Sequence, residues 1–523
     1  MKKVFTFILA LLLFSVCYAN KYQIKSVDYN IEPSAIKILG VTKPYCLEQK
    51  VSVDTDTVFE SEEELLAYLE DYKQKLNNTR VFEDLSVDYS IVNIELPQED
   101  EVYQVNLKVF LKDSIHIFVL PGPKYDSNSG LKLKFKIKDF NFLGTLNTMN
   151  SDIYILIPTF ESDNKDCELG FNFSFDYPFK AGISDATWVN DIGFSYTFGD
   201  KIPEWDVKTG VKFQIPFENY SLISEIYQKS VNNLDYEAFN DSLYFSEEFK
   251  FSVPISIYKS NTLGTFTYTP YADIFFNWDF DHISENNSSL SSPVAYAGHS
   301  FSFGRVDWQN NLRNGISFSI DNYYLYNFQR KMFYPIMSLD VRAYKAFTLF
   351  EAPVFNRIGI NTKLYGFVYM LNPAKNEYIK YDGKAFGGEL RGIRDDQKYM
   401  GTGINSLAST SAIVLNLDFP YHLFTTNFTA KFIKYFNFDL QISPFIDIAL
   451  YYNKITEKWF SLKDGFYSAG LEFLVYPTKW SGITVRANFG YDIGRKFFKN
   501  YLNMDWRTDS SMYEVYLGLG LQY

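Results

Sequence analysis

The chain has 523 residues, a formal net charge of -12 at pH 7 and a sequence pI near 5.1. This acidic balance, with no basic patch carrying interleaved aromatic residues, argues against nucleic acid as a partner. Aromatic residues make up 19% of the chain and the mean hydropathy is -0.17. Such a composition fits a large secreted β-sandwich or propeller. It also fits a β-barrel with aromatic girdles, in which lipid-facing and lumen-facing residues cancel in the average.

The N-terminus has the pattern of a secretory signal peptide over residues 1–19. The chain opens Met-Lys-Lys, continues with an apolar run over residues 4–16 and reaches Ala19 shortly afterwards. A positive start, a short apolar stretch and a small residue before the cut predict cleavage after Ala19. A lipoprotein signal through Cys17 is the second interpretation, and it is weaker because Val16 is a poor small residue at the preceding position. No later stretch has the roughly 20 apolar residues of a membrane helix.

The reactive residue types form no recognisable site. Cys46 and Cys167 remain after cleavage, far apart in the sequence and in different predicted domains, so they are expected to be free. The four histidines are scattered, and the sequence has no Cys-x-x-Cys, His-Glu-x-x-His or nucleophile-elbow motif. We therefore expect no catalytic residue, no metal site and no cofactor, and we do not expect an enzyme.

Residues 20–118 are predicted to form a small α+β domain, which is a normal domain size. Ser61 and Glu64 make a capping box, in which each side chain accepts a hydrogen bond from a free amide at the start of a helix. The helix that follows carries one apolar stripe of Leu65, Leu69, Tyr72 and Leu76. Alternating apolar residues predict a strand near residues 22–27 and a hairpin over residues 85–89 and 105–111. A short first helix fits between residues 43 and 57.

From residue 131 onward apolar and polar residues alternate persistently. Runs of this kind cover residues 131–138, 171–177, 192–198, 266–278, 316–320, 483–492 and 513–523. Successive side chains on a strand point to opposite faces, so one face is aromatic and apolar and the other is polar. The last run carries Leu519, Leu521 and Tyr523 on its apolar face. With about 24 residues for each strand and its connection, of which about 9–11 span, residues 119–523 are expected to form a mostly β, about 16-stranded antiparallel transmembrane barrel.

Two positions in this region are notable. Arg391 follows Gly387 and Gly388 closely and is itself followed by Gly392. Asp447 lies on a strand whose even positions from 436 to 450 are mostly apolar, so Asp447 faces the lumen if the other face meets lipid. An arginine that reaches such an aspartate can grip it through two parallel hydrogen bonds. Taken singly, Arg391 is more simply explained as a solvated arginine in a loop, and Asp447 as a charge in the lumen of a porin.

In their order along the chain, these motifs resemble the BamA and TamA superfamily of outer-membrane protein insertases and translocators, which includes two-partner secretion pores. The Arg391, Gly392 and Ile393 triplet is similar to the family's Arg-Gly-aromatic loop motif, with Ile393 where the family usually has Tyr or Phe. Phe445 and Asp447 resemble the family's strand motif, whose aspartate meets that arginine.

Further segments carry the same resemblance across most of the chain. Ala449 stands where family members commonly have glycine, and residues 415–420 match the strand that follows the loop. Residues 123–128 and 141–144 resemble the start of the barrel. Residues 20–118 look like one polypeptide-transport-associated (POTRA) domain, with residues 82–85 at its helix-to-strand corner.

The resemblance implies an outer-membrane barrel with residues 20–118 in the periplasm. It implies a role in inserting or translocating unfolded outer-membrane or secreted polypeptides, which would add as strands to the POTRA-like domain. It assigns a loop tether to Arg391, Gly392 and Asp447, flanked by Gly387, Gly388 and Ile393. The resemblance also implies outer-membrane lipids, and allows accessory lipoproteins, as further partners. A two-partner secretion pore stays open within this class, and a passive porin or a structural surface barrel stays open outside it.

Overall fold

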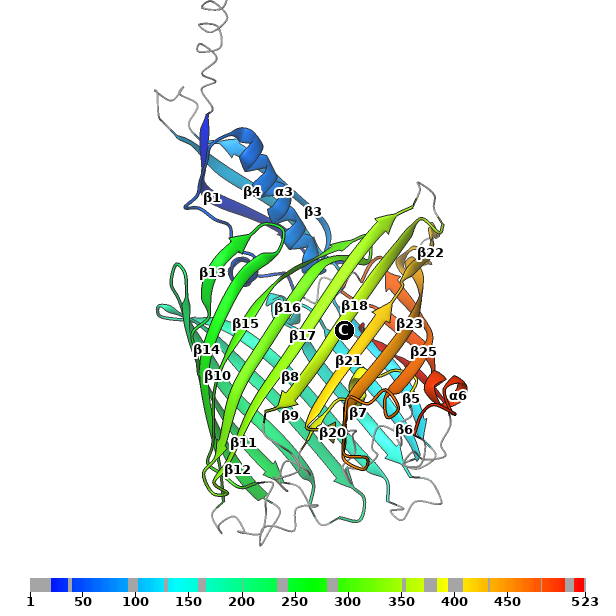
Figure 1. Ribbon diagram of the computed structural model, residues 1–523. Coiled ribbons are helices and arrows are strands. Elements are labelled where there is room, and N and C mark those ends of the chain that lie inside the picture. The colour runs from blue at the N-terminus through cyan, green and yellow to red at the C-terminus, as the bar shows by residue number, and fades with distance from the viewer. Residues whose placement is uncertain are drawn as a thin grey trace, which may run out of the picture. The chain divides into compact units, whose positions relative to one another are not determined.

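A computed structural model describes residues 20–35, 40–92, 102–126, 130–158, 166–200, 202–232, 243–279, 290–349, 354–370, 383–393, 408–430, 433–480, 482–503 and 512–521 (Figure 1). The expected signal peptide lies outside these ranges. The chain divides into two compact units, Met1–Ser114 and Ile115–Tyr523. The boundary expected after residue 118 falls within the first strand of the second unit. No helix among the described residues is long and apolar enough to cross a membrane.

The first unit is a four-stranded sheet in the order β2-β1-β4-β3. Its elements are β1 (Lys21–Glu32), α2 (Pro44–Lys50), β2 (Val58–Phe59), α3 (Glu62–Asn78), β3 (Phe82–Ile91) and β4 (Val102–Asp113). Strands β1 and β4 run parallel, whereas β3 is antiparallel to β4. The apolar stripe of α3 is buried along its whole length, so the predicted helix face is the one that packs into the unit.

Helix α3 begins with the capping residues expected from the sequence, although one partner differs. The Glu64 amide donates to Ser61 Oγ at 3.2 Å, and the Glu64 carboxylate accepts from the amide of Glu60, one residue before the expected Ser61. We expect Ser61→Ala to destabilise the start of α3 by about 0.5–2 kcal/mol, because the Glu64 amide loses its acceptor. Hydrogen exchange of the α3 amides in the full chain measures this effect. Ser86→Ala, which removes a half-buried hydroxyl on β3 that donates to Asp88, is the control, and equal exchange in both variants would contradict the prediction.

The second unit is a closed barrel, and every strand pairing described in its wall is antiparallel (Figure 1). Its first strands are β5 (Ile117–Asp126), β6 (Gly130–Asp139), β7 (Met149–Ile157), β8 (Glu168–Ala181), β9 (Ser184–Thr197), β10 (Glu204–Pro216), β11 (Ser221–Asn232), β12 (Leu243–Ser252), β13 (Ile255–Ser260) and β14 (Gly264–Trp278). The remaining strands are β15 (Val294–Gln309), β16 (Leu312–Asn327), β17 (Met332–Thr348), β18 (Arg357–Tyr369), β21 (Ser411–Asp418), β22 (Tyr421–Thr425), β23 (Phe438–Asn453), β24 (Lys458–Trp459), β25 (Phe466–Pro477), β26 (Val485–Tyr491) and β27 (Tyr513–Leu519). Short helical turns are η2 (Phe142–Gly144), η5 (Ile433–Phe436) and α6 (Ile493–Phe497).

The number of strands in the wall exceeds the expected number of about 16. The barrel order contains 21 segments, but β12 and β13 pair in succession with β14, and β21 and β22 both pair with β18 and β23. The two-residue β24 only extends a hairpin from β23. Joining these segments leaves 18 strands among the described residues. The estimate was low because several connections are far shorter than assumed; the turn between β8 and β9 consists of Gly182 and Ile183.

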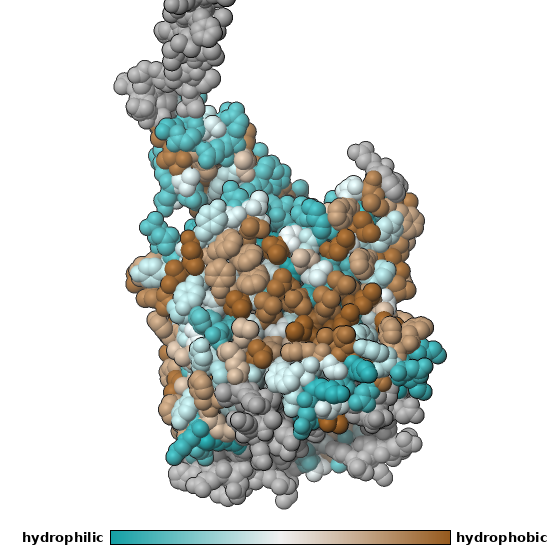
Figure 2. Space-filling model, viewed as in Figure 1, coloured by the Kyte–Doolittle hydropathy of each residue, from teal (hydrophilic) through white to brown (hydrophobic). Residues whose placement is uncertain are grey.

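The barrel wall has the two faces that the alternation predicts. On β23 the odd residues from Asp439 to Tyr451 are buried, whereas Ile446 points outward and is 39% exposed. Leu471 and Phe473 on the neighbouring β25 are similarly exposed, at 40% and 42%. Hydrophobic residues gather across the middle of the visible face of the barrel, with hydrophilic residues toward its lower edge (Figure 2). The outer face is therefore apolar and the inner face carries most of the buried polar groups.

The terminal strand is shorter than the sequence suggests. Leu519 pairs with Val485 of β26 through the backbone, and β27 ends there. Gly520 has a φ of +87°, a left-handed conformation that interrupts a strand, so Leu521 follows β27 instead of lying on it. Tyr523 lies outside the described residues.

Candidate functional site

The candidate site is the segment of residues 383–393 between β18 and β21, here called the inner loop. It begins with β19 (Lys384–Ala385), which pairs with β20 (Ala408–Ser409), and continues through the turn η4 (Gly387–Glu389). Four of its side chains are 1–2% exposed: Phe386, Leu390, Arg391 and Ile393. A loop with this much buried surface is packed against its surroundings and is not a solvated connection.

Arg391 and Asp447 lie together, joined by three hydrogen bonds. Arg391 Nε donates to Asp447 Oδ2 at 2.9 Å, and a terminal nitrogen donates to Oδ1 at 2.7 Å. The backbone amide of Arg391 donates to the same carboxylate at 2.9 Å. The Phe445 ring stacks on the guanidinium, with its centre 3.9 Å from the Cζ atom of Arg391. This parallel two-bond geometry fixes the orientation of the arginine as well as its position.

Two more carboxylates bind the same guanidinium, and neither was expected from the sequence. The second terminal nitrogen of Arg391 lies 2.7 Å from Asp418 Oδ1 and 3.2 Å from Glu472 Oε2. The side chains of Asp418, Asp447 and Glu472 are 8%, 0% and 4% exposed. Asp418 is on β21 and Glu472 on β25, the strands on either side of β23. Their inward positions in the alternation were the available signal, but alternation alone does not show which inward residues meet the loop.

Gly392 brings the inner loop onto the last strands of the barrel. Its amide donates to Glu514 Oε2 on β27 at 2.9 Å. Its φ is +73°, and a Cβ at this position would lie 2.6 Å from the backbone nitrogen of Tyr491 and 2.8 Å from the carbonyl carbon of Gly490. Glycine is therefore required at position 392 on both conformational and steric grounds.

The two glycines before Arg391 have ordinary backbone conformations, and Gly388 is less constrained than Gly392. Gly387 is buried in η4, whereas a Cβ on Gly388 would meet no atom within 4 Å. Neither residue has a positive φ. The close approach to the wall is therefore made at Gly392, whereas the space beside Gly388 is open.

A second ion pair holds the inner loop with the opposite polarity. Glu389 of the loop binds Lys363 of β18 at 2.5 Å, and the Lys363 side chain is 5% exposed. The Asn416 side chain on β21 donates to the carbonyl oxygen of Glu389 at 2.8 Å. The loop therefore carries a cation that meets wall carboxylates and an anion that meets a wall lysine, and both contacts favour the observed placement of the segment.

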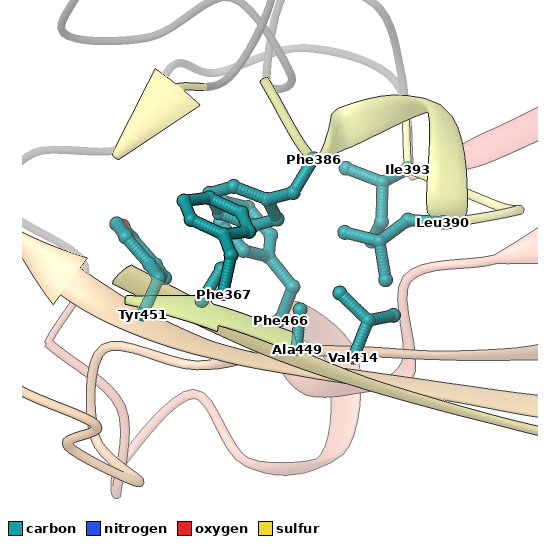
Figure 3. Close-up of a cluster of buried hydrophobic side chains, with 9 residues drawn as sticks. Phe367, Phe386, Leu390, Ile393, Val414, Ala449, Tyr451 and Phe466 are labelled. Carbon is teal, nitrogen blue, oxygen red and sulfur yellow. The ribbon is translucent and has the colours of Figure 1, made fainter. Parts of the chain in front are cut away.

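Ile393 belongs to an apolar cluster inside the barrel (Figure 3). The buried members of this cluster are Phe367, Phe386, Leu390, Ile393, Ala412, Val414, Ala449, Tyr451 and Phe466. Phe386 lies 5.2 Å from the Tyr451 ring, and Tyr451 lies 5.7 Å from Phe466. An aliphatic residue at position 393 is therefore accommodated because aromatic packing comes from Phe386, a loop residue that the motif did not single out.

We expect Phe386→Ala to loosen the inner loop, with a cost of roughly 3–5 kcal/mol if the space left by the ring stays empty. Protease cleavage within residues 383–393 of the detergent-solubilised chain should become faster, and the unfolding midpoint should fall. Phe428→Ala is the matched control, because Phe428 is 43% exposed. An unchanged cleavage rate in Phe386→Ala would show that the cluster does not hold the loop.

The two cysteines form no disulfide. Cys46 and Cys167 are both free, and Cys46 is buried. Within the part of the chain that the structure describes, no group of three or more His, Cys, Asp or Glu residues is placed to hold a metal ion.

The chain is similar to several solved structures at low sequence identity. CdiB from Acinetobacter baumannii is 13% identical, with a TM-score of 0.44 over 90% of this chain and 70% of that chain. CdiB from Escherichia coli is 9% identical, with a TM-score of 0.39 over 97% and 91%. BamA from Haemophilus ducreyi lacking POTRA domains 1-3 is 12% identical, with a TM-score of 0.33 over 95% and 85%. No protein-family model and no curated protein sequence matches the chain.

Proposed function

We propose that this protein is an outer-membrane barrel of the BamA and TamA type that assists the insertion or translocation of polypeptides. The observation that carries the proposal is the inner loop, held inside the barrel by Arg391, Asp447 and their neighbours. The loop motif and the strand motif that resemble this superfamily are the two parts that meet in this contact. The role needs no covalent chemistry and no cofactor.

The inner loop supports this role by organising the wall near its last strands. Its contacts reach β18 through Lys363, β21 through Asp418, β23 through Asp447, β25 through Glu472 and β27 through Glu514. A segment fixed at so many points keeps the C-terminal part of the barrel in one arrangement. We propose that the inner loop acts as a tether that keeps these strands in one arrangement while the barrel inserts or translocates its client polypeptides.

The sheet of the first unit has open edges that support a role in capturing client polypeptides. We propose that it is a single POTRA domain in the periplasm. In the sheet order β2-β1-β4-β3, the two-residue β2 pairs only with Tyr22 and Gln23 of β1. The rest of β1 and the outer side of β3 have no strand partner among the described residues. Such edges accept an extended polypeptide as an additional strand.

Depletion of the protein tests the proposal. Levels of other outer-membrane and surface proteins should fall, and nascent chains should crosslink to residues of β1 or β3. Re-expression of the unaltered chain should restore these levels, whereas Arg391→Ala should not. Unchanged protein levels after depletion would overturn the proposed function.

A passive channel is the second candidate, and the charged inner wall favours it. Lys208 binds Glu248 at 2.9 Å and Lys229 binds Asp206 at 2.8 Å, as expected for a water-filled lumen. A large, steady conductance in planar bilayers that Arg391→Ala leaves unchanged would support this candidate. Such a result together with unaffected client levels would replace the insertion role.

A further inference from the structure

The hairpin formed by β15 and β16 leaves the barrel wall before it turns, and its residues 305–314 are here called the inner hairpin. The pairing of β15 with β14 reaches Ser302, and that of β16 with β17 begins at Gly315. Beyond these positions the two strands pair only with each other among the described residues. Gly304 and Gly315 stand at this point with φ values of +156° and +131°, which favour glycine. The two glycines therefore mark a bend at which the hairpin departs from the wall.

The inner hairpin lies at the end of the barrel where β5 begins. Strands of the wall alternate in direction from β5 onward, so the turn between β15 and β16 is at the same end as the start of β5. The inner loop enters the lumen from the opposite end, between β18 and β21. Because β5 directly follows the first unit, the proposed function places the inner hairpin at the periplasmic end.

The tip of the inner hairpin is held by Asp439, an inward residue at the start of β23 that is 2% exposed. Asn311 Nδ2 donates to Asp439 Oδ2 at 3.1 Å, and Gln441 Nε2 donates to the carbonyl oxygen of Asn311 at 3.1 Å. Arg357 of β18 donates from one terminal nitrogen to the carbonyl oxygen of Asn310 and from the other to Asp439 Oδ1, both at 3.1 Å. These four hydrogen bonds form a polar latch between the tip and the wall.

The contacts of the inner hairpin cross the lumen. In the wall, β15 and β23 are separated by β16, β17, β18 and the joined β21 and β22. Five steps of about 4.7–4.9 Å place the two strands roughly 24 Å apart along the wall. The centre of the Trp308 ring of β15 nevertheless lies 6.4 Å from that of the Tyr476 ring of β25, one strand further still. The inner hairpin therefore lies across this end of the lumen instead of following the wall.

The inner hairpin covers one side of the Arg391 site. A cavity of about 20 Å³, room for about one water molecule, is lined by Asn311 and Leu312 of the hairpin. Its other side includes Asp418 and Glu472, two of the carboxylates that bind Arg391. The inner loop and the inner hairpin thus approach the same cluster from opposite ends of the barrel.

We propose that the inner hairpin is a displaceable lid, which shuts the periplasmic side of the Arg391 site at rest and swings out at Gly304 and Gly315 to admit a polypeptide. The hairpin can move as one body, because its two strands are paired with each other. Its latch lies at a tip where Asn310 is exposed, so the latch hydrogen bonds can be exchanged for hydrogen bonds to water at a small net cost. The inference rests on the proposed function only for the identity of what passes the lid.

Thiol labelling of the purified full chain in detergent tests the lid. The reporter is S443C in a chain whose native cysteines are replaced by serine, because Ser443 lines the covered cavity and is 2% exposed. Asn311→Gly removes the side chain that binds Asp439 but keeps the turn, since Asn311 has a φ of +62° and Asn-Gly suits a two-residue hairpin turn. The variant should speed labelling of S443C by a maleimide about 2- to 13-fold, the factor that corresponds to one hydrogen bond.

Two controls are matched to this experiment. Asn310→Gly makes the same change at the neighbouring turn residue, which has a φ of +49° and contributes its carbonyl oxygen to the latch, so labelling should stay unchanged. A second reporter, S246C on β12, lines a different cavity and should not respond to N311G. Equal labelling of S443C with and without N311G would overturn the lid. An equal rise in N310G or at S246C would also overturn it, because the barrel would then be loosening as a whole.

A cross-link tests whether the lid has to open for the proposed function. A reversible bis-thiosulfonate reagent that joins W308C to Y476C would hold the hairpin across the lumen, where the two rings already lie together. In cells depleted of the unaltered chain, the linked form should fail to restore the levels of outer-membrane proteins, and a reductant should restore them. Full restoration by the linked form would overturn the lid as a gate for polypeptides.

The lid and the proposed function can fail separately. If N311G exposes S443C but depletion leaves outer-membrane proteins unchanged, the inner hairpin stands as a movable lid and the insertion role falls. If depletion lowers client levels but S443C stays protected in N311G, the insertion role stands and the inner hairpin is a fixed part of the barrel.

Discussion

Arg391→Ala is expected to destabilise the barrel by roughly 3–5 kcal/mol, because removal of one partner leaves buried charges without compensation. Asp447, Asp418 and Glu472 converge on this guanidinium, and their side chains are at most 8% exposed. Urea unfolding of the detergent-solubilised chain, followed by the shift in gel mobility between folded and unfolded barrel, measures the change.

Two variants show whether the geometry of Arg391 matters beyond its charge. Arg391→Lys keeps the positive charge but loses the two parallel hydrogen bonds to Asp447, so an intermediate loss is expected. Arg342→Ala is the matched control, since Arg342 binds Asp340 at 2.8 Å with the two side chains 36% and 28% exposed. An ion pair this exposed is worth about 0–1 kcal/mol. Equal stability losses in Arg391→Ala and Arg342→Ala would mean that the three carboxylates are solvated and that Arg391 holds nothing in place.

Gly392→Ala is expected to displace the inner loop even though Arg391 is intact. A non-glycine residue at a φ of +73° costs about 1–3 kcal/mol. The added Cβ would approach the backbone of Gly490 and Tyr491 to 2.8 and 2.6 Å, and overpacking of this kind costs about 1–3 kcal/mol more. The loop should relieve the clash by moving away from β26, which breaks the hydrogen bond from Gly392 to Glu514. Faster protease cleavage within residues 383–393 and a lower unfolding midpoint are the measurements.

Gly388→Ala separates this effect from a general sensitivity of the loop. Gly388 lies four residues earlier in the same loop, and a Cβ there meets nothing within 4 Å. The cleavage rate and unfolding midpoint of Gly388→Ala should match those of the unaltered chain. If the alanine is tolerated equally well at positions 388 and 392, the tight contact between the inner loop and β26 does not exist in solution.

Much of the local structure could be predicted from the sequence. The capping residues Ser61 and Glu64 lie at the start of α3, and the apolar stripe of that helix is the face that packs. The alternation on β23 correctly predicted that Asp447 faces inward. These predictions succeed because a helix cap and the orientation of a strand residue depend on positions only a few residues apart.

Other features depend on contacts across long sequence separations and could not be predicted in this way. The partners of Arg391 and Gly392 lie 27, 56, 81 and 122 residues along the chain, on β21, β23, β25 and β27. Any inward carboxylate on these strands was an equal candidate until their register was known. The apolar inner cluster was also not predicted. Ala449 and Tyr451 share the inward face with Asp447, and alternation does not show that the inner loop covers them.

Alternation along the chain separated the two faces of the strands, the capping residues marked the start of α3, and the motifs named Arg391 and Asp447 as a possible contact. Only the folded barrel shows which three carboxylates share the arginine, that Gly392 lies against the wall, and that Phe386 supplies the aromatic packing. It also decided the number of strands, because short turns such as that between β8 and β9 leave no trace in the alternation. The physical reason is that side-chain orientation in a strand repeats every two residues, whereas a lumenal contact is set by how strands far apart in sequence come together in the closed barrel.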